Sequence, residues 1–335
     1  MGEKVRWGVL GAAKIAVEKV IPAMGRGEWS EVVAIASRDA GVAARVAREL
    51  GVAKSYGSYE GLLADPSIEA VYIPLPNHMH VPWALKAAEA GKHVLCEKPI
   101  AMSAAEARLL LDARGRWGVK IQEAFMVRTH PQWEAARELA RSGRIGELRS
   151  VECVFSYFNR DPHNIRNIPA AGGGALMDIG CYPVQISRFL YGAEPRRVLA
   201  LVERDPEMRT DHLTSAVLDF GAGRAAFTCS TQLVAHQRVE LLGTVGRVEI
   251  EVPFNAPPDR PTRIFVDDGS ALGGAGAEAI EFPPCDQYTI QGDLFSRAVR
   301  EGTEQPIPLE DAVGNMAVID ALFRSAESGR WEAPG

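Results

Sequence analysis

The sequence predicts two domains: an N-terminal α/β domain with a doubly wound parallel sheet, and a C-terminal α+β domain with a large, mostly antiparallel open sheet. Apolar strand-like runs alternate with helix-like stretches up to residue 126, which is typical of a parallel sheet with right-handed crossovers. Beyond residue 126, strand-like runs follow one another across short turns, which favours hairpins. The 335 residues suffice for two cores, and we place the domains at residues 1–126 and 127–335.

The composition argues against several classes of protein. With 47% hydrophobic and 24% charged residues, the chain resembles an ordinary soluble globular protein. Its net charge of −6 argues against nucleic-acid binding and against attraction to an anionic membrane. No apolar run is long enough to span a bilayer, and a strand begins where a signal peptide would have its apolar region. The five scattered cysteines fit reduced thiols in the cytoplasm, not a disulfide framework or a zinc site.

The first strand, residues 5–10, leads into a helix through the motif Gly11-Ala12-Ala13-Lys14-Ile15-Ala16. A dinucleotide-binding domain has Gly-x-Gly-x-x-Gly at this turn, for a tight bend, a close approach to pyrophosphate and close helix packing. This chain keeps the first glycine and has alanine at the other two positions. Because N–H groups at a helix start hold phosphates, residues 11–15 are predicted to contact a dinucleotide.

The second strand, residues 31–37, ends in Ser37-Arg38-Asp39. NAD enzymes usually carry an acid here that binds the ribose 2′-hydroxyl. A hydroxyl followed by a guanidinium suits a 2′-phosphate instead, because arginine binds phosphate with a planar, permanently charged fork. Asp39 either caps the next helix beside a solvated Arg38 or turns towards the ribose. NADP is therefore the predicted cofactor, and NAD remains possible through Asp39.

Two further strand ends carry polar residues. Strand 70–75 runs into a rigid turn in which Leu75, Pro76, Asn77 and His80 are candidate cofactor contacts. The histidines of this turn lack carboxylate or thiol neighbours at a spacing that fits a metal site. Strand 93–96 delivers Glu97-Lys98-Pro99 to the edge where α/β sheets bind ligands, although a surface Glu–Lys pair is the alternative interpretation.

The remaining predicted elements complete the two domains. The helices are 40–50, 81–91, 103–117, 130–142, 286–301 and 309–328, and the strands are 119–126, 147–158, 197–204, 212–220, 224–232, 237–242, 246–252 and 262–266. Residues 253–261 and 269–276 are rich in glycine and proline and are predicted as exposed loops. The alternating Val239, Leu241 and Val248 indicate a sheet face without helical cover, through which copies of the chain would form a dimer or tetramer.

The segment 170–191 combines three glycines with a helix. Gly172-Gly173-Gly174 lets the backbone approach something closely, and Asp178 and Tyr182 are four residues apart, so they share a face of a regular helix. Pro183 removes a helical N–H and predicts a break or kink near residues 180–183. The alternative is an ordinary packing helix with a capping aspartate.

Together these motifs resemble the Gfo/Idh/MocA oxidoreductase family, along essentially the whole chain. The matching motifs are Gly11-Ala12-Ala13-Lys14-Ile15-Ala16, Ala36-Ser37-Arg38, Pro74 to His80, Glu97-Lys98-Pro99, Glu123-Ala124-Phe125-Met126, His130-Pro131-Gln132 and Gly172 to Tyr182. The resemblance implies that Lys98 is catalytic, that Glu97 lies in the cofactor site and that Asp178 places the substrate. Many members have histidine where this chain has Tyr182, and tyrosine is found in the aldose dehydrogenase, glucose-fructose oxidoreductase and sugar-nucleotide ketoreductase branches.

The implied reaction moves a hydride between nicotinamide and a carbinol or carbonyl carbon of a sugar or polyol, so a group must take or supply the hydroxyl proton. Tyrosine has a reference pKa near 10, and a lysine ammonium nearby stabilises its phenolate. We assign Tyr182 as acid/base, Lys98 as its electrostatic partner and Asp178 as an anchor for a neighbouring hydroxyl. Arg166 is a further candidate for substrate contact and Arg128 for cofactor contact. The nicotinamide is expected between the two domains.

Other functions remain open from the sequence. They are a nucleotide-linked keto-sugar reductase, a trans-dihydrodiol dehydrogenase, a redox-neutral enzyme that uses NAD to assist glycoside cleavage, and a non-catalytic NADP-binding sensor. The joint presence of Lys98 and Tyr182 argues against the sensor. The identity of the sugar, its stereochemistry and the direction of the reaction are not determined by the sequence.

Overall fold

The computed structural model describes residues 3–271 and 274–335, so two residues of the predicted loop 269–276 lie outside the described residues. The chain forms two compact units. The first comprises Met1–Met126 and Asp286–Val313, and the second comprises Val127–Cys285 and Gly314–Gly335. This division places residues 286–313 in the first unit, whereas the sequence analysis assigned all of residues 127–335 to the second domain.

These residues join the first unit because their contacts lie there. The indole Nε1 of Trp7 donates a hydrogen bond to Ser296 Oγ at 2.9 Å, and the Trp7 and Phe295 rings lie 5.5 Å apart. Arg300 forms an ion pair of 2.6 Å with Glu69. All of these contacts join residues more than 200 positions apart, so no local pattern reveals them.

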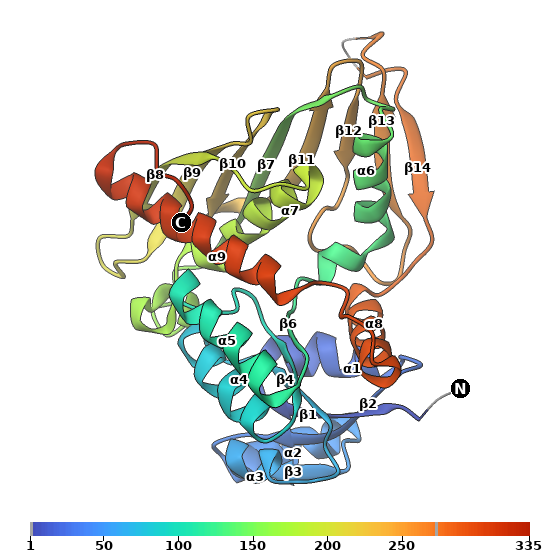
Figure 1. The fold of residues 1–335 in the computed structure, drawn as a ribbon, viewed down its shortest axis with the longest axis vertical. Coiled ribbons are helices and arrows are strands. Elements are labelled where there is room, and N and C mark those ends of the chain that lie inside the picture. The colour runs from blue at the N-terminus through green and yellow to red at the C-terminus, as the bar shows by residue number, and fades with distance from the viewer. Residues whose placement is uncertain (1–2, 272–273) are drawn as a thin grey trace. The chain divides into compact units, whose positions relative to one another are not determined.

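The first unit contains a sheet of six parallel strands in the order β3-β2-β1-β4-β5-β6 (Figure 1), which confirms the predicted fold class. The strands are β1 (Val5–Leu10), β2 (Ser30–Ala36), β3 (Lys54–Tyr56), β4 (Ala70–Ile73), β5 (His93–Cys96) and β6 (Ile121–Glu123). The order reverses between β1 and β4, where doubly wound sheets bind ligands outside the carboxyl ends of their strands. The three-residue strand β3 was not predicted, because it is too short to show alternation.

Helices lie between these strands along the chain: α1 (Ile21–Gly25), α2 (Ala40–Leu50), α3 (Tyr59–Leu63), α4 (His80–Glu89) and α5 (Ala104–Trp117). Helix α8 (Gln287–Glu301) follows β14 in the chain and packs against β1 and β2. A π-helical turn, Ala16–Val20, precedes α1, and a 3-10 turn, Asn77–Met79, precedes α4. The Ser103 side chain caps α5 by accepting a hydrogen bond from the Glu106 N–H at 3.2 Å, which fixes where that helix begins.

The second unit contains a sheet of eight strands in the order β14-β13-β12-β11-β7-β10-β9-β8, and β7 and β10 are its parallel pair. The strands are β7 (Leu148–Phe158), β8 (Arg197–Arg204), β9 (Asp211–Asp219), β10 (Arg224–Ser230), β11 (Gln232–Gly243), β12 (Arg247–Ile250), β13 (Thr262–Asp267) and β14 (Glu278–Phe282). This mostly antiparallel sheet confirms the prediction for the second fold. Strand β14 was missed because its residues are mainly polar or exposed.

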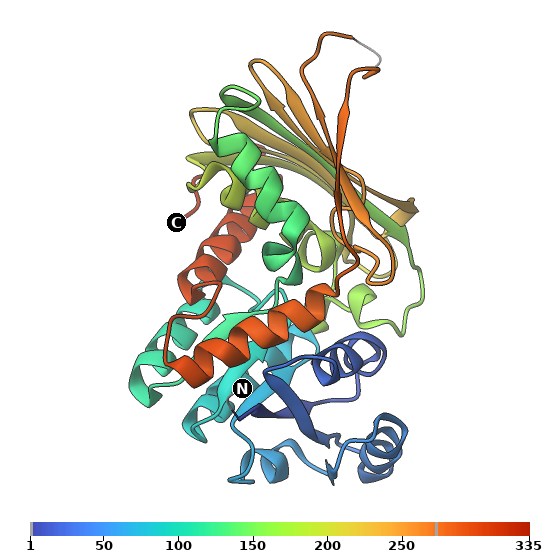
Figure 2. The same cartoon turned by 90° about the vertical axis from the view of Figure 1, so that its right-hand side faces the viewer.

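Helices cover one face of this sheet (Figure 2). They are α6 (Pro131–Arg141), α7 (Cys181–Tyr191) and, from Gly314 onward, α9 (Leu309–Ser328). Val239, Leu241 and Val248 are fully buried, in alternation with Arg238 and Glu240. They therefore point to the covered face, and the prediction that they mark an uncovered face was wrong.

The loop 253–261 fits its prediction as an exposed loop only in part, since residues 258–261 are exposed and others are buried. Phe254 within it is fully buried, with its ring centroid 4.6 Å from that of Phe155 and 6.2 Å from that of Trp133. A proline and glycine count cannot show such packing, because one aromatic side chain suffices to bury part of a loop.

No helix among residues 3–271 and 274–335 is long and apolar enough to cross a membrane.

Candidate functional site

The carboxyl edge of the six-stranded sheet carries the predicted cofactor motifs. Gly11 directly follows β1, and its N–H donates a hydrogen bond to Ala36 O, at the end of β2, at 2.9 Å. Gly11 has φ +120, and a Cβ on it would lie 3.0 Å from Leu75 Cδ2, in the loop after β4. Both the conformation and the close approach require glycine here. Ala12, Ala13, Lys14 and Ile15 then lead into the first helix, whose early N–H groups have no intrahelical partner.

After the end of β2, Arg38 is exposed, whereas the Asp39 side chain is bonded to the next helix. The Asp39 carboxylate caps α2, where its Oδ1 accepts hydrogen bonds from the N–H groups of Gly41 at 2.7 Å and Val42 at 3.1 Å. Burial raises the pKa of Tyr59, and the charge of the exposed Arg38 and a hydrogen bond with it counteract part of this rise. The Tyr59 hydroxyl lies 3.9 Å from the position of a Cβ on Gly11. Arg38 is thus held beside the glycine turn, with Ser37 next to it.

Glu97 and Lys98 follow β5, where the Lys98–Pro99 peptide bond is cis. The Tyr72 hydroxyl donates a hydrogen bond of 2.7 Å to Glu97 Oε1, and the Lys98 N–H donates one of 3.3 Å to Oε2. Burial and Glu97 raise the pKa of Tyr288 on α8, whereas Lys98 lowers it. Tyr72 and Tyr288 are therefore neighbours of this charged pair. The sequence interpretation missed both, since a buried strand tyrosine and a distant helix show no local sign of the contact.

His80 was predicted to contact the cofactor, but its side chain lies buried between two loops. The ring is fully buried, with Nδ1 2.8 Å from Pro99 O and Nε2 2.7 Å from Leu75 O. Burial lowers its pKa to about 4, although both carbonyls favour the protonated ring. Because both nitrogens face main-chain carbonyls, His80 ties the loop after β4 to the loop after β5. Pro76 and Asn77 lie between these tied positions and are half-buried.

In the second unit Asp178 is the centre of a polar cluster with Tyr157 and Arg166. Its Oδ2 accepts a hydrogen bond from the Tyr157 hydroxyl at 2.6 Å and one from Arg166 Nε at 3.0 Å. The Arg166 side chain is 43% exposed and the Asp178 side chain 12%. Asp178, with burial opposing, raises the pKa of Arg166. A carboxylate that is held by a cation and a phenol stays ionised, so it acts as a hydrogen-bond acceptor. Tyr157, on β7, was not predicted.

Two of the three glycines before Asp178, Gly173 and Gly174, are explained by close approaches within the same unit, and Gly172 has φ +81. A Cβ on Gly173 would lie 2.5 Å from Arg166 O, and one on Gly174 would lie 1.9 Å from Asp211 Oδ1. Gly174 also has φ +127. The backbone here therefore approaches protein groups, which bring the Arg166 turn against the start of the helix.

The helix itself is irregular where Pro183 predicts a break. Leu176–Gly180 forms a π-helical turn, and α7 begins at Cys181. Tyr182 follows in the first turn of α7 and is 5% exposed, with its ring centroid 5.6 Å from Phe155 and 5.2 Å from Phe254. Arg128 packs in the same unit, its guanidinium 4.2 Å from the Phe189 ring. This contact of Arg128 is therefore a packing contact with α7, and its predicted contact with the cofactor stays a prediction.

Comparison with known proteins places the chain in a family. Residues 5–125 match a family model described as an oxidoreductase family with an NAD-binding Rossmann fold, and residues 133–249 match a Gfo/Idh/MocA C-terminal domain. An uncharacterised oxidoreductase of Rhizobium meliloti is 52% identical over 98% of both chains. An NADP(+)-dependent D-xylose 1-dehydrogenase of Haloferax volcanii is 40% identical over 96% of this chain and 98% of that one.

A solved structure agrees with these matches along the whole fold. A 3-ketoreductase from Actinomadura kijaniata in complex with NADP and TDP-benzene has a TM-score of 0.90 and 29% identity, over 96% of this chain and 98% of that chain. The family resemblance of the motifs is thereby confirmed, and so is the assignment as an oxidoreductase. The chain belongs to the Gfo/Idh/MocA family and is an NAD(P)-binding oxidoreductase.

Proposed function

We propose that the protein is an NADP-dependent dehydrogenase or reductase that acts on a carbinol or carbonyl carbon of a sugar or polyol. The observation that carries the proposal is the Asp178 cluster. A carboxylate kept ionised by Arg166 and Tyr157 accepts hydrogen bonds from substrate hydroxyl groups. Asp178 stands four residues before Tyr182, whose hydroxyl group can exchange a proton. A substrate with several hydroxyl groups needs both a hydrogen-bond acceptor for one hydroxyl and a proton-exchanging group for another.

The cofactor, when bound, accepts or supplies the hydride. In this proposal Tyr182 exchanges the hydroxyl proton of the substrate, Lys98 stabilises the negative charge that develops on oxygen, and Asp178 orients the sugar through a neighbouring hydroxyl. Solved structures of the Actinomadura ketoreductase include variants of one lysine and of one tyrosine. Those two residues are separated by the same number of positions as Lys98 and Tyr182, which supports the two assignments.

The choice of NADP rests on the end of β2. The Asp39 carboxylate is engaged by α2, so Ser37 and the exposed Arg38 are the groups that would meet a 2′-phosphate. The Haloferax relative is named as NADP-dependent and the Actinomadura structure contains NADP, which agrees with this choice. The motifs after β1 and β4, together with Glu97, would complete the cofactor site.

A substrate panel tests the function directly. NADPH formation would be followed with aldoses including D-xylose, with inositols and with a trans-dihydrodiol, and NADPH consumption with keto-sugars, free and nucleotide-linked. We expect turnover of free NADP⁺ with an aldose or polyol. Turnover confined to nucleotide-linked keto-sugars or dihydrodiols would favour the second candidates, for which relatives at 33% identity are named. Glycoside cleavage without net turnover of NADP⁺ would overturn the proposal.

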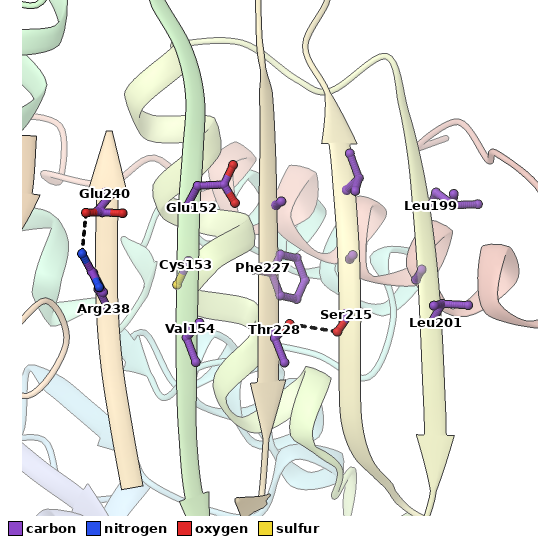
Figure 3. Close-up of a pocket in the computed structure, with 14 residues that line it drawn as sticks. Glu152, Cys153, Val154, Leu199, Leu201, Ser215, Phe227, Thr228, Arg238 and Glu240 are labelled. Carbon is purple, nitrogen blue, oxygen red and sulfur yellow. Dashed lines mark hydrogen bonds and ion pairs between the residues drawn. The ribbon is translucent and has the colours of Figure 1, made fainter. Parts of the chain in front are cut away.

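We further propose a cytoplasmic location, since the five cysteines, all among the described residues, form no disulfide, as is usual in a reducing compartment. We also propose that two copies pair through the sheet face opposite the helices. A hollow of about 500 Å³ lies on this sheet, and Figure 3 shows the side chains that line it. Leu201, in its lining, is 77% exposed, and Glu152 and Arg238 place both signs of charge around it. Arg238 is paired with Glu240 at 2.6 Å within the chain, so an isologous contact would place the apolar residues of two copies against each other across a twofold axis, with these charges at its rim.

Light scattering at micromolar concentration tests this pairing. We expect a dimer or tetramer for the wild type and a smaller species for Leu201→Glu, because a buried charge without a partner destabilises an interface. Leu109→Glu is the matched control, since Leu109 is 49% exposed on α5 of the other unit. A wild-type monomer, or equal effects of both substitutions, would contradict this surface.

A further inference from the structure

The helical turn that carries Asp178 has its N-terminus bonded to a buried carboxylate. Asp211, the first residue of β9, is 1% exposed. Its Oδ2 accepts a hydrogen bond from the Leu176 N–H at 2.6 Å and one from the Thr214 hydroxyl at 3.3 Å. Burial raises the pKa of Asp211, and the Leu176 N–H counteracts this. The helix N-terminus, with its partial positive charge, is the environment that allows such a carboxylate.

The same carboxylate also fixes the residue before the turn. Its Oδ1 occupies the space of a Cβ on Gly174, 1.9 Å from that position, so no other residue fits opposite Asp211 without displacement. The carbonyl of Gly174 in turn accepts the N–H of Asp178 at 3.0 Å. A short chain of contacts therefore runs from Asp211 through the backbone to Asp178.

The other end of the turn rests on the neighbouring strand. A Cβ on Gly180 would lie 2.8 Å from Cys229 Sγ, and Cys229 is fully buried on β10. Cys229 pairs in the sheet with Thr214, the residue whose hydroxyl bonds to Asp211. The turn thus lies on one continuous patch of β9 and β10, with its N-terminus set by a hydrogen bond and its C-terminus by close packing.

We infer that Asp211 is a positioning residue for the reaction. It fixes the start of the π-helical turn, and with it the positions of Asp178 and of Tyr182 in the first turn of α7. The inference rests on the proposed function, because it concerns the roles given there to Asp178 and Tyr182. The Asp178 Oδ2 accepts the hydrogen bonds from both Tyr157 and Arg166. A shift of the turn would separate these groups, and misplacement by about 1 Å can cost on the order of a hundredfold in rate.

Asp211→Ala and Asp211→Asn separate positioning from general structure. Alanine removes the acceptor for the Leu176 N–H, and we expect kcat/KM for the sugar substrate to fall on the order of tenfold to hundredfold. Asparagine keeps an acceptor oxygen, and we expect most of the activity to return. The NADP⁺ dissociation constant should stay at the wild-type value in both, since the cofactor motifs lie in the first unit. Asp219→Asn is the matched control: Asp219 ends the same strand and pairs on the surface with Arg197 at 2.8 Å.

Each outcome has a defined meaning. Folded Asp211→Ala with wild-type kcat and KM overturns the inference, and so does loss of activity in Asp211→Asn equal to that in Asp211→Ala. If Asp211→Ala does not fold, Thr214→Val, which removes one donor to the carboxylate, should lower kcat at unchanged melting temperature, and unchanged kcat would overturn the inference. Asp178→Asn is measured in parallel. Wild-type activity of Asp178→Asn would refute the proposed role of Asp178. If Asp178→Asn is inactive while Asp211→Ala keeps wild-type activity, only the positioning role of Asp211 is refuted.

Discussion

Tyr182→Phe is expected to lower kcat on the order of a hundredfold to ten-thousandfold, the usual contribution of a positioned acid or base. The substitution removes the hydroxyl that would exchange the substrate proton and keeps the ring, which packs on Phe155 and Phe254. Stability should therefore change little. NADP⁺ affinity should not change, because the predicted cofactor motifs belong to the first unit. Steady-state kinetics, with a fluorescence titration of the cofactor, measures both quantities.

The same helix offers a matched control. Tyr191 ends α7, and its hydroxyl donates a hydrogen bond to Arg224 O at 2.8 Å. Tyr191→Phe removes the same atom from the same element and should leave kcat near the wild-type value. Lys98→Ala should resemble Tyr182→Phe, and the double variant should lose less than the product of the two effects, since residues that act as a unit are non-additive. A Tyr182→Phe enzyme with wild-type kcat would contradict the acid/base assignment.

Arg38→Ala is expected to weaken NADP binding tenfold to hundredfold and to leave NAD binding nearly unchanged. The substitution removes one charge-assisted contact to the 2′-phosphate, worth about 1.5–3 kcal/mol. NAD has no phosphate at this position, and Asp39 stays engaged with α2 in the variant. The measurement is the dissociation constant of each cofactor for the wild type and the variant.

Arg45→Ala controls for a general loss of positive charge. Arg45 lies on α2 and forms an exposed ion pair with Glu49 at 3.1 Å, so its removal should alter neither constant. If NADP and NAD weaken equally in Arg38→Ala, the guanidinium does not distinguish the two cofactors. A wild type that prefers NAD would direct attention to Asp39.

The predictable part of the fold came from local patterns. The residues at the ends of β1, β2 and β5 were placed correctly, because strand alternation and turn residues depend on neighbours a few positions away. The bounds of α2 also agree with the prediction, since Asp39 before it and Gly51 after it are a standard cap and stop. The predicted cofactor motifs therefore lie at one sheet edge, as a parallel sheet requires.

The neighbours of the site depend on contacts between distant segments. Tyr157 meets Asp178 because β7 passes the π-helical turn, and Asp211 meets Gly174 from a strand that begins later in the chain. Neither contact has a periodicity or a motif, so neither was predicted. His80 was assigned to the cofactor from its motif, yet the packing of two loops gave both its nitrogens main-chain partners.

Local patterns were enough to predict the two fold classes and the family, because alternation, turn residues and short motifs are local properties of the chain. Two features depend on contacts between distant segments: the sheet face on which Val239 and Leu241 lie, and the packing of Asp286–Val313 in the first unit. Sheet register and helix packing are settled by the burial of side chains far apart in the sequence. A register shift of one residue would exchange the two faces while the same hydrophobic alternation remained.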